Sequence, residues 1–209
     1  MKSKFHYILF NKPYGVLSQF TSLAGHPSLR DYGPFPKGVY PVGRLDADSE
    51  GLLLLTDDNE TKHGLTTPAF RHDRSYLVQV ENIPEEPALQ KLRAGVIIEG
   101  RTTLPARVHI LEPEPLLFPR LVPIRFRKDI PTCWLELILT EGRNRQVRKM
   151  TAAVGHPTLR LVRTRISFLT MDGIHPGESR ELTAKEISKL RDIIEPADKT
   201  AKPRWSGLH

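Results

Sequence analysis

The chain has 209 residues, 39% of them hydrophobic, and its 31 lysines and arginines outnumber 24 aspartates and glutamates, giving a net charge of +7. That length can fill one substantial core, or one core divided between two subdomains. The single cysteine, Cys133, excludes an intrachain disulfide, and no zinc-site spacing of histidines or cysteines occurs. No apolar run approaches the roughly 18 residues of a membrane span, and the N-terminus lacks a secretory signal, so we expect a cytoplasmic protein. The charge favours a polyanionic partner, although an ordinary basic surface would give the same balance.

The first third of the chain predicts short strands and one short helix. Strands are expected over residues 5–10, 39–42 and 52–56, with a proline- and glycine-containing turn over residues 11–15. Asp57, Asp58 and Asn59 can cap a helix that runs to about Leu65. Alternating apolar residues then predict a half-buried strand over residues 75–81, with Tyr76 facing the core.

The remaining elements follow from the same local signals. A helix is expected over residues 85–94, with strands over 96–98 and 108–111. Five prolines between Pro113 and Pro131 predict an ordered loop or edge hairpin. We further expect a strand over 132–140, a helix over 144–154 capped by Asn144, a basic strand over 158–168, a strand over 178–182, a helix over 183–194 and a mobile tail over 197–209. This mixture indicates an α+β fold, with a mainly antiparallel mixed sheet and short flanking helices.

Three carboxylates, Asp46, Asp48 and Glu50, stand directly before four consecutive leucines, and we call them the acidic run. Because the leucine strand must be buried, these acids lie at the edge of a core. Their spacing resembles half of a calcium loop. The fifth and twelfth positions of that loop carry Glu50 and Asp57, however, where a calcium site uses Asp or Asn and then Glu, so we expect no metal.

Two interpretations of the acidic run remain. Asp46 and Asp48 would lie roughly 6–7 Å apart on one face of a strand, so as a glycosidase pair both would approach a sugar from the same side. The other interpretation is a single working aspartate, with Asp48 and Glu50 as turn and surface acids. Desolvation disfavours an ionised carboxylate. The working aspartate therefore needs a cation beside it to stay ionised.

Arg148 is the expected cation. It lies about 100° from Val147 around the 144–154 helix and flanks the apolar stripe, whereas Arg145 and Lys149 are expected to face solvent. The alternative is that Arg148 is a surface arginine whose aliphatic part covers apolar residues while its charge stays in water.

Two segments about a hundred residues apart carry a resemblance to a known family. They are Gly43-Arg44-Leu45-Asp46 with Glu50-Gly51-Leu52-Leu53, and Glu141-Gly142-Arg143-Asn144-Arg145-Gln146-Val147-Arg148-Lys149-Met150. With them the chain resembles the RsuA/RluB/RluE/RluF family of bacterial rRNA pseudouridine synthases, over roughly residues 5–182. The segments 11–15 and 159–163 fit the same family. Thr132-Cys133-Trp134-Leu135 and the proline-rich loop before it most resemble the RluE type, whose target is a uridine in 23S rRNA.

The resemblance implies a catalytic domain over residues 1–196, in two subdomains of about 1–66 and 67–196 with a central RNA-binding cleft. A strand pattern from residue 5 leaves no room for the S4 RNA-binding module that most members carry. By resemblance, Asp46 is the catalytic aspartate, Tyr76 stacks on the target base, Arg148 is the basic partner of the aspartate, and Leu161 is the apolar wall. Arg74 stands where many relatives have lysine.

The implied reaction breaks the N1–C1′ bond of a uridine, turns the uracil and rejoins it through C5. No atom is gained or lost, so no redox cofactor or ATP is needed. Asp46 attacks C1′ or C6, or promotes elimination to a glycal, and the sequence leaves these routes open. The target base must leave its stack to reach the acid, at a cost of a few kcal/mol.

The expected partner is rRNA, free or in an assembling large subunit, bound by a monomer. Basic residues near the motifs are expected to contact phosphate, which is recognised without regard to sequence. They are Arg44, Arg74, Arg143, Arg145, Lys149 and Arg163, with Arg160 and Arg165. A rival from another class is a non-catalytic rRNA-binding or ribosome-assembly factor on the same fold, which would have no need for Asp46, Tyr76 and Arg148 together.

Overall fold

The fold is seen in a computed structural model that describes residues 4–23, 25–124 and 127–194. The tail expected over residues 197–209 and residues 125–126 of the proline-rich loop therefore lie outside the described residues. In the part that is described, no helix has the length and apolar character needed to cross a membrane.

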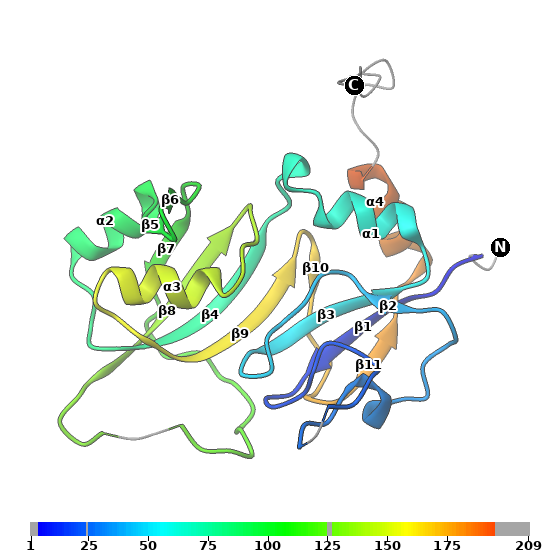
Figure 1. Ribbon diagram of the computed structural model, residues 1–209, viewed down its shortest axis with the longest axis horizontal. Coiled ribbons are helices and arrows are strands. Elements are labelled where there is room, and N and C mark those ends of the chain that lie inside the picture. Colours follow the sequence, from blue (N-terminus) through cyan, green and yellow to red (C-terminus); the bar gives the residue numbers. More distant parts are fainter. Residues whose placement is uncertain (1–3, 24, 125–126, 195–209) are drawn as a thin grey trace.

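One nine-stranded sheet runs through the described part of the molecule (Figure 1). Its strands are β1 (Tyr7–Lys12), β2 (Tyr40–Pro41), β3 (Glu50–Thr56), β4 (Arg74–Glu81), β7 (Arg107–Ile110), β8 (Thr132–Leu139), β9 (Thr158–Ile166), β10 (Leu169–Thr170) and β11 (Ser179–Glu181). The main order is β11-β1-β3-β9-β4-β8-β7, with β2 beside β3 and β10 beside β9. The β3–β9 pair is parallel and the other pairs in this sheet are antiparallel. A separate hairpin pairs β5 (Ile97–Ile98) with β6 (Arg101–Thr102).

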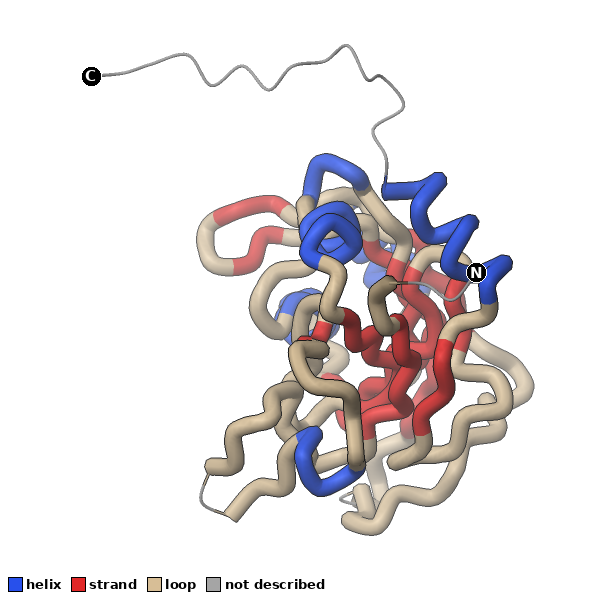
Figure 2. The backbone as a smooth tube through the Cα atoms, turned by 90° about the vertical axis from the view of Figure 1, so that its right-hand side faces the viewer, coloured by secondary structure: helices blue, strands red, loops and turns tan. Residues whose placement is uncertain are grey.

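Helices cover both halves of the sheet. They are α1 (Asn59–Thr66), α2 (Glu86–Ala94), α3 (Gln146–Ala153) and α4 (Ala184–Ile194), with 3-10 turns η1 (Leu29–Tyr32) and η2 (Pro68–Phe70). Figure 1 shows α2 and α3 together over the β4–β8 half and α1 and α4 together over the β1–β3 half. In Figure 2 most helical segments lie in the upper part of the molecule and the long loops in the lower part. The predicted α+β fold with a mainly antiparallel sheet is confirmed.

The hydrophobic core consists of separate clusters, and β3 is shared between two of them. Leu52 and Leu54 pack with α1 and α4, whereas Leu53 and Leu55 face a second cluster that includes Leu29 of η1. All four leucines are fully buried. Each stabilises the fold by about 1.5–3 kcal/mol relative to an exposed side chain, which makes β3 a rigid support for the loop before it.

The other large cluster lies between α2, α3 and the central strands β4 and β8. Val78, Leu135 and Leu137 are completely buried in it, as the alternation in the sequence predicts. The division into subdomains near residue 66 stays a prediction. In the structure, the C-terminal elements β11 and α4 pack beside β1 and α1, so the two ends of the described chain meet in one half (Figure 1).

One local expectation was wrong. The helix begins at Gln146, because Arg145 has a left-handed backbone with φ 51°, and the Asn144 side chain accepts a hydrogen bond from Lys149 Nζ instead of capping the helix. Residues 113–124 and 127–131 form an irregular loop, which is one of the two forms expected for this proline-rich segment. The cap at α1 is provided by Asp58, whose carboxylate accepts from the Glu60 N–H.

Candidate active site

The loop between β2 and β3 carries Asp46 and is held by backbone contacts. The Ser18 hydroxyl donates to the Leu45 carbonyl at 2.7 Å and accepts from the Leu45 N–H at 3.1 Å. The Gly15 N–H donates to the Ala47 carbonyl at 2.7 Å. These bonds fix the residues on both sides of Asp46, so its carboxylate is presented by an ordered loop.

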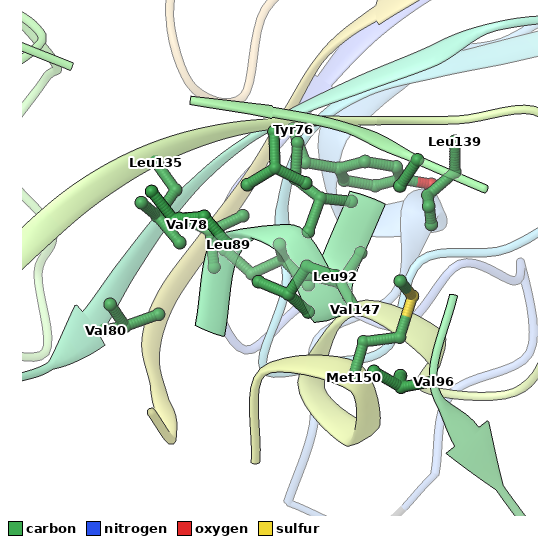
Figure 3. Packing of buried hydrophobic residues seen from close by; sticks show 14 of the residues in the cluster. Tyr76, Val78, Val80, Leu89, Leu92, Val96, Leu135, Leu139, Val147 and Met150 are labelled. Carbon is green, nitrogen blue, oxygen red and sulfur yellow. The ribbon is translucent and has the colours of Figure 1, made fainter. Parts of the chain in front are cut away.

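A cavity of about 480 Å³ opens beside this loop. Asp46 lines it together with Tyr76 of β4, Leu161 of β9 and Val147 of α3. Tyr76 is only 8% exposed, and Figure 3 shows it inside the apolar cluster that includes Val147 and Leu139. The volume lies within the roughly 300–1,000 Å³ of typical small-ligand sites. The predicted aspartate, tyrosine and leucine therefore meet at one pocket with an apolar wall.

Asp46 pairs with Arg145 and not, as expected, with Arg148. Arg145 Nη1 lies 3.4 Å from Asp46 Oδ2, and its two Nη atoms bind both carboxylate oxygens of Asp48 at 3.0 and 2.8 Å. Arg148 donates to the Asp48 backbone carbonyl at 2.6 Å, and its Nε lies 3.4 Å from Asp48 Oδ2. Arg145 is exposed, as expected of a solvent-facing residue, but its guanidinium also contacts the acidic run, which was not expected. Its left-handed backbone turns the side chain toward the acidic run.

The charges around Asp48 keep it ionised. Burial by itself raises the pKa of Asp48, but the hydrogen bonds from Arg145 and the charges of Arg148 and Arg145 hold this pKa below its usual value. Burial lowers the pKa of Arg148, and the Asp48 carboxylate opposes that shift. Asp48 thus links both arginines to the loop that carries Asp46, a role that its position in a turn did not reveal.

Glu50 is a buried acid, not a surface acid. Arg160 binds it in a bidentate pair, with Nε to Oε1 at 2.9 Å and Nη2 to Oε2 at 2.8 Å, and each side chain is only 10% exposed. Arg160 Nη2 also donates to the Phe118 carbonyl in the proline-rich loop at 2.9 Å. Arg160 is therefore used inside the protein and does not contribute to a phosphate-binding surface.

Lys12 is a buried cation that interacts with the acidic run, and the sequence reasoning assigned it no role. It is completely buried at the end of β1, and its Nζ donates to the carbonyls of Pro13 and Val16 at 2.9 and 2.8 Å. Burial lowers the pKa of Lys12 to about 7, while the three carboxylates of the acidic run oppose that shift. The turn motif at residues 11–15 contains this lysine, but nothing in the motif itself indicates burial.

The other predicted binding residues differ in how accessible they are. Arg44 is exposed and lines the cavity, whereas Arg143 lines it while donating to the backbone of the β5–β6 hairpin. Lys149 pairs with Glu99 at 2.6 Å, and Arg74 donates to the Leu65 carbonyl at 2.8 Å.

Arg163 and Arg165 depart further from the expectation. Arg163 is only 4% exposed, so its prediction as a surface phosphate ligand was wrong. Arg165 donates to the Ser75 hydroxyl and the Ser167 carbonyl. The arginines of β9 indicated a basic strand that contacts phosphate. In the structure, β9 lies between β3 and β4 in the middle of the sheet.

Known proteins are similar to this chain in sequence and in fold. Residues 6–153 match the family described as RNA pseudouridylate synthase. Ribosomal large subunit pseudouridine synthase E of Xanthomonas axonopodis pv. citri is 53% identical over 171 residues, which are 81% of this chain and 90% of that protein. The enzyme of the same name from Vibrio parahaemolyticus is 49% identical over 84% of this chain and 73% of that protein.

A solved pseudouridylate synthase crystal structure superimposes with a TM-score of 0.74 at 29% identity, over 90% of this chain and 75% of that one. The fold is also shared by human RNA pseudouridylate synthase domain containing 1, with a TM-score of 0.55 at 17% identity over 91% and 93% of the two chains. The resemblance carried by the two sequence motifs is thereby confirmed. The chain belongs to the RNA pseudouridylate synthase family and is an isomerase.

Proposed function

We propose that this protein converts a specific uridine of 23S rRNA in the large ribosomal subunit to pseudouridine, with Asp46 as the essential carboxylate. The observation that carries the proposal is the cavity that Asp46, Tyr76 and Leu161 line together. The names of the relatives, which refer to the large ribosomal subunit, support the choice of substrate. We further propose that the protein acts as a cytoplasmic monomer on free rRNA or on an assembling particle.

The cavity suits a nucleotide that has left its helix. Tyr76 offers an aromatic face for the extruded uracil, and aromatic stacking contributes about 1–3 kcal/mol per base. Leu161 and Val147 complete an apolar wall that excludes water from the base. Stacking therefore offsets much of the few kcal/mol needed to unstack the target.

Asp46 carries out the bond exchange at the sugar or the base. The N1–C1′ bond breaks and a C5–C1′ bond forms, while the proton on C5 is lost and N1 gains a proton. Arg145 contacts the carboxylate and is itself fixed by Asp48, so it holds a positive charge beside the group that acts in each of the possible routes. Arg44, exposed at the rim of the cavity, is suited to bind a phosphate of the RNA backbone.

The proposal is tested with rRNA that carries tritium at C5 of uridine, since isomerisation releases that tritium to water. Asp46→Asn preserves the shape of the side chain but removes its charge, so we expect no tritium release and nearly unchanged RNA affinity. Asp192→Asn, at an exposed position of α4 remote from the cavity, is the matched control and should retain full activity. Turnover by the Asp46 variant at the wild-type rate would refute the assignment.

The same assay separates the enzyme from a non-catalytic assembly factor on this fold. Such a factor would bind rRNA without releasing tritium. Comparing free rRNA with assembling particles identifies the preferred form of the substrate, and carbodiimide-dependent primer extension then locates the modified uridine.

A further inference from the structure

Arg163 is a buried cation whose position near the cavity has no explanation in phosphate binding. Its Nε donates to the Leu52 carbonyl at 2.8 Å, while Nη2 has no hydrogen-bond partner among the described residues. No carboxylate within the described parts of the chain forms an ion pair with it. A buried guanidinium with a free N–H is costly, so a neighbouring group is expected to use it.

The neighbour that faces Arg163 is Tyr76. The two residues are direct partners across the antiparallel β4–β9 pair, so their side chains stand on the same face of the sheet. Burial lowers the pKa of the Arg163 guanidinium, and the Tyr76 side chain opposes that shift by charge interaction and hydrogen bonding. Arg74, the other cation near this pair, acts in the opposite direction and lowers the pKa of Arg163.

The chemistry of the two groups determines how they can interact. A guanidinium only donates hydrogen bonds, whereas a phenol donates one and accepts others. A hydrogen bond from Arg163 to the Tyr76 oxygen would require the phenolic hydrogen to point elsewhere and would fix the tilt of the ring. Tyr76 lines the cavity, so such a hydrogen bond would set the orientation of the face on which the target base would stack.

We propose that Arg163 is a positioning residue, which acts through the Tyr76 hydroxyl to orient the tyrosine for the reaction. The inference rests on the proposed role of Tyr76 at the base. It assigns Arg163 no contact with the RNA backbone, and this separates it from the cations at the rim of the cavity.

Kinetics with Arg163→Met, Tyr76→Phe and the double variant test the proposal. A hydrogen bond to a charged group contributes about 1.5–3 kcal/mol, so we expect Arg163→Met to lower kcat about 10- to 100-fold. KM for the RNA and the salt dependence of binding should not change, because no phosphate contact is lost. In the Tyr76→Phe background, where the hydroxyl is absent, Arg163→Met should cause little further loss.

Three results would overturn the inference. They are a smaller salt dependence in Arg163→Met, an equal loss of kcat with and without the Tyr76 hydroxyl, and a Tyr76→Phe enzyme with the wild-type kcat. The last result would leave the proposed function intact, since the phenylalanine ring still stacks. Conversely, activity of Asp46→Asn would refute the proposed function without bearing on the contact between Arg163 and Tyr76.

A second variant and a measurement without substrate keep the test valid if Arg163→Met folds poorly. Arg163→Lys retains the charge and should recover part of the lost kcat. In protein labelled with carbon-13 at the tyrosine Cζ atoms, the Tyr76 signal is identified by its absence from Tyr76→Phe. That signal should move in both Arg163 variants, and an unmoved signal would show that the two side chains do not interact.

Discussion

The buried ion pair between Glu50 and Arg160 gives a quantitative test of how the acidic run is held. Both side chains are 10% exposed, and two hydrogen bonds of 2.9 and 2.8 Å join them. Glu50→Gln keeps the shape but removes the charge, which leaves the Arg160 guanidinium buried without a counter-charge. Breaking a buried pair in this way costs about 3–5 kcal/mol. For a chain of this length, a loss of about 4 kcal/mol corresponds to a Tm lower by about 8–16 °C.

Urea unfolding of the wild type and the variant measures this loss. The matched control is Glu86→Gln, which removes the same charge from an ion pair with Arg93 whose side chains are 57% and 38% exposed. Exposed pairs contribute at most about 1 kcal/mol, so the control should lose far less stability than Glu50→Gln. The double variant Glu50→Gln/Arg160→Met should be more stable than the sum of the two single losses predicts, because it leaves no unpaired charge. Equal losses at Glu50 and Glu86 would refute the argument from burial.

Two further predictions concern backbone geometry and pH. Gly51 has φ 104° and an added Cβ would lie 2.2 Å from the Arg163 carbonyl oxygen, so Gly51→Ala should lose about 2–4 kcal/mol in urea unfolding. Gly100→Ala, at φ 74° with open space around it, should lose only about 1 kcal/mol, and similar losses at both sites would contradict the steric argument. The hydrogen bond from Arg180 is the main cause that lowers the pKa of Glu186 from 4.5 to about 2. The ionised Glu186 therefore stabilises the fold fully above pH 4.5, and this stabilisation is lost as the pH falls through 2. In Glu186→Gln, the free energy of unfolding measured in urea should therefore fall less between pH 4.5 and pH 2 than in the wild type. An unchanged pH dependence would show that the pair of Glu186 and Arg180 does not stabilise the fold.

Most of the elements could be predicted because their signals are local. Alternation over residues 132–140 predicts a strand, and β8 covers Thr132–Leu139. Proline before and glycine after residues 85–94 predict α2, which covers Glu86–Ala94. The 2-residue strands β6 and β10 were missed, because two residues contain no recognisable period.

The partners of the charged residues could not be predicted. Arg148 was expected beside Asp46 because it flanks the apolar stripe of the helix, whereas the ion pair with Asp46 is made by Arg145, a left-handed residue just before α3. This difference changes which guanidinium points at Asp46. A sequence pattern gives the order of side chains around a helix, but not the backbone angle at its first residue.

The sequence by itself therefore determined the elements, the two motifs and the residues that lie in them, because these depend on neighbours within a few positions. The tertiary structure alone decided which charges are buried and what they bind. Glu50 binds Arg160, and Arg163 stands opposite Tyr76, across strands that are far apart in the chain. The physical reason is that burial of an ionisable group depends on the strands beside it, and the parallel β3–β9 pair joins residues more than a hundred positions apart.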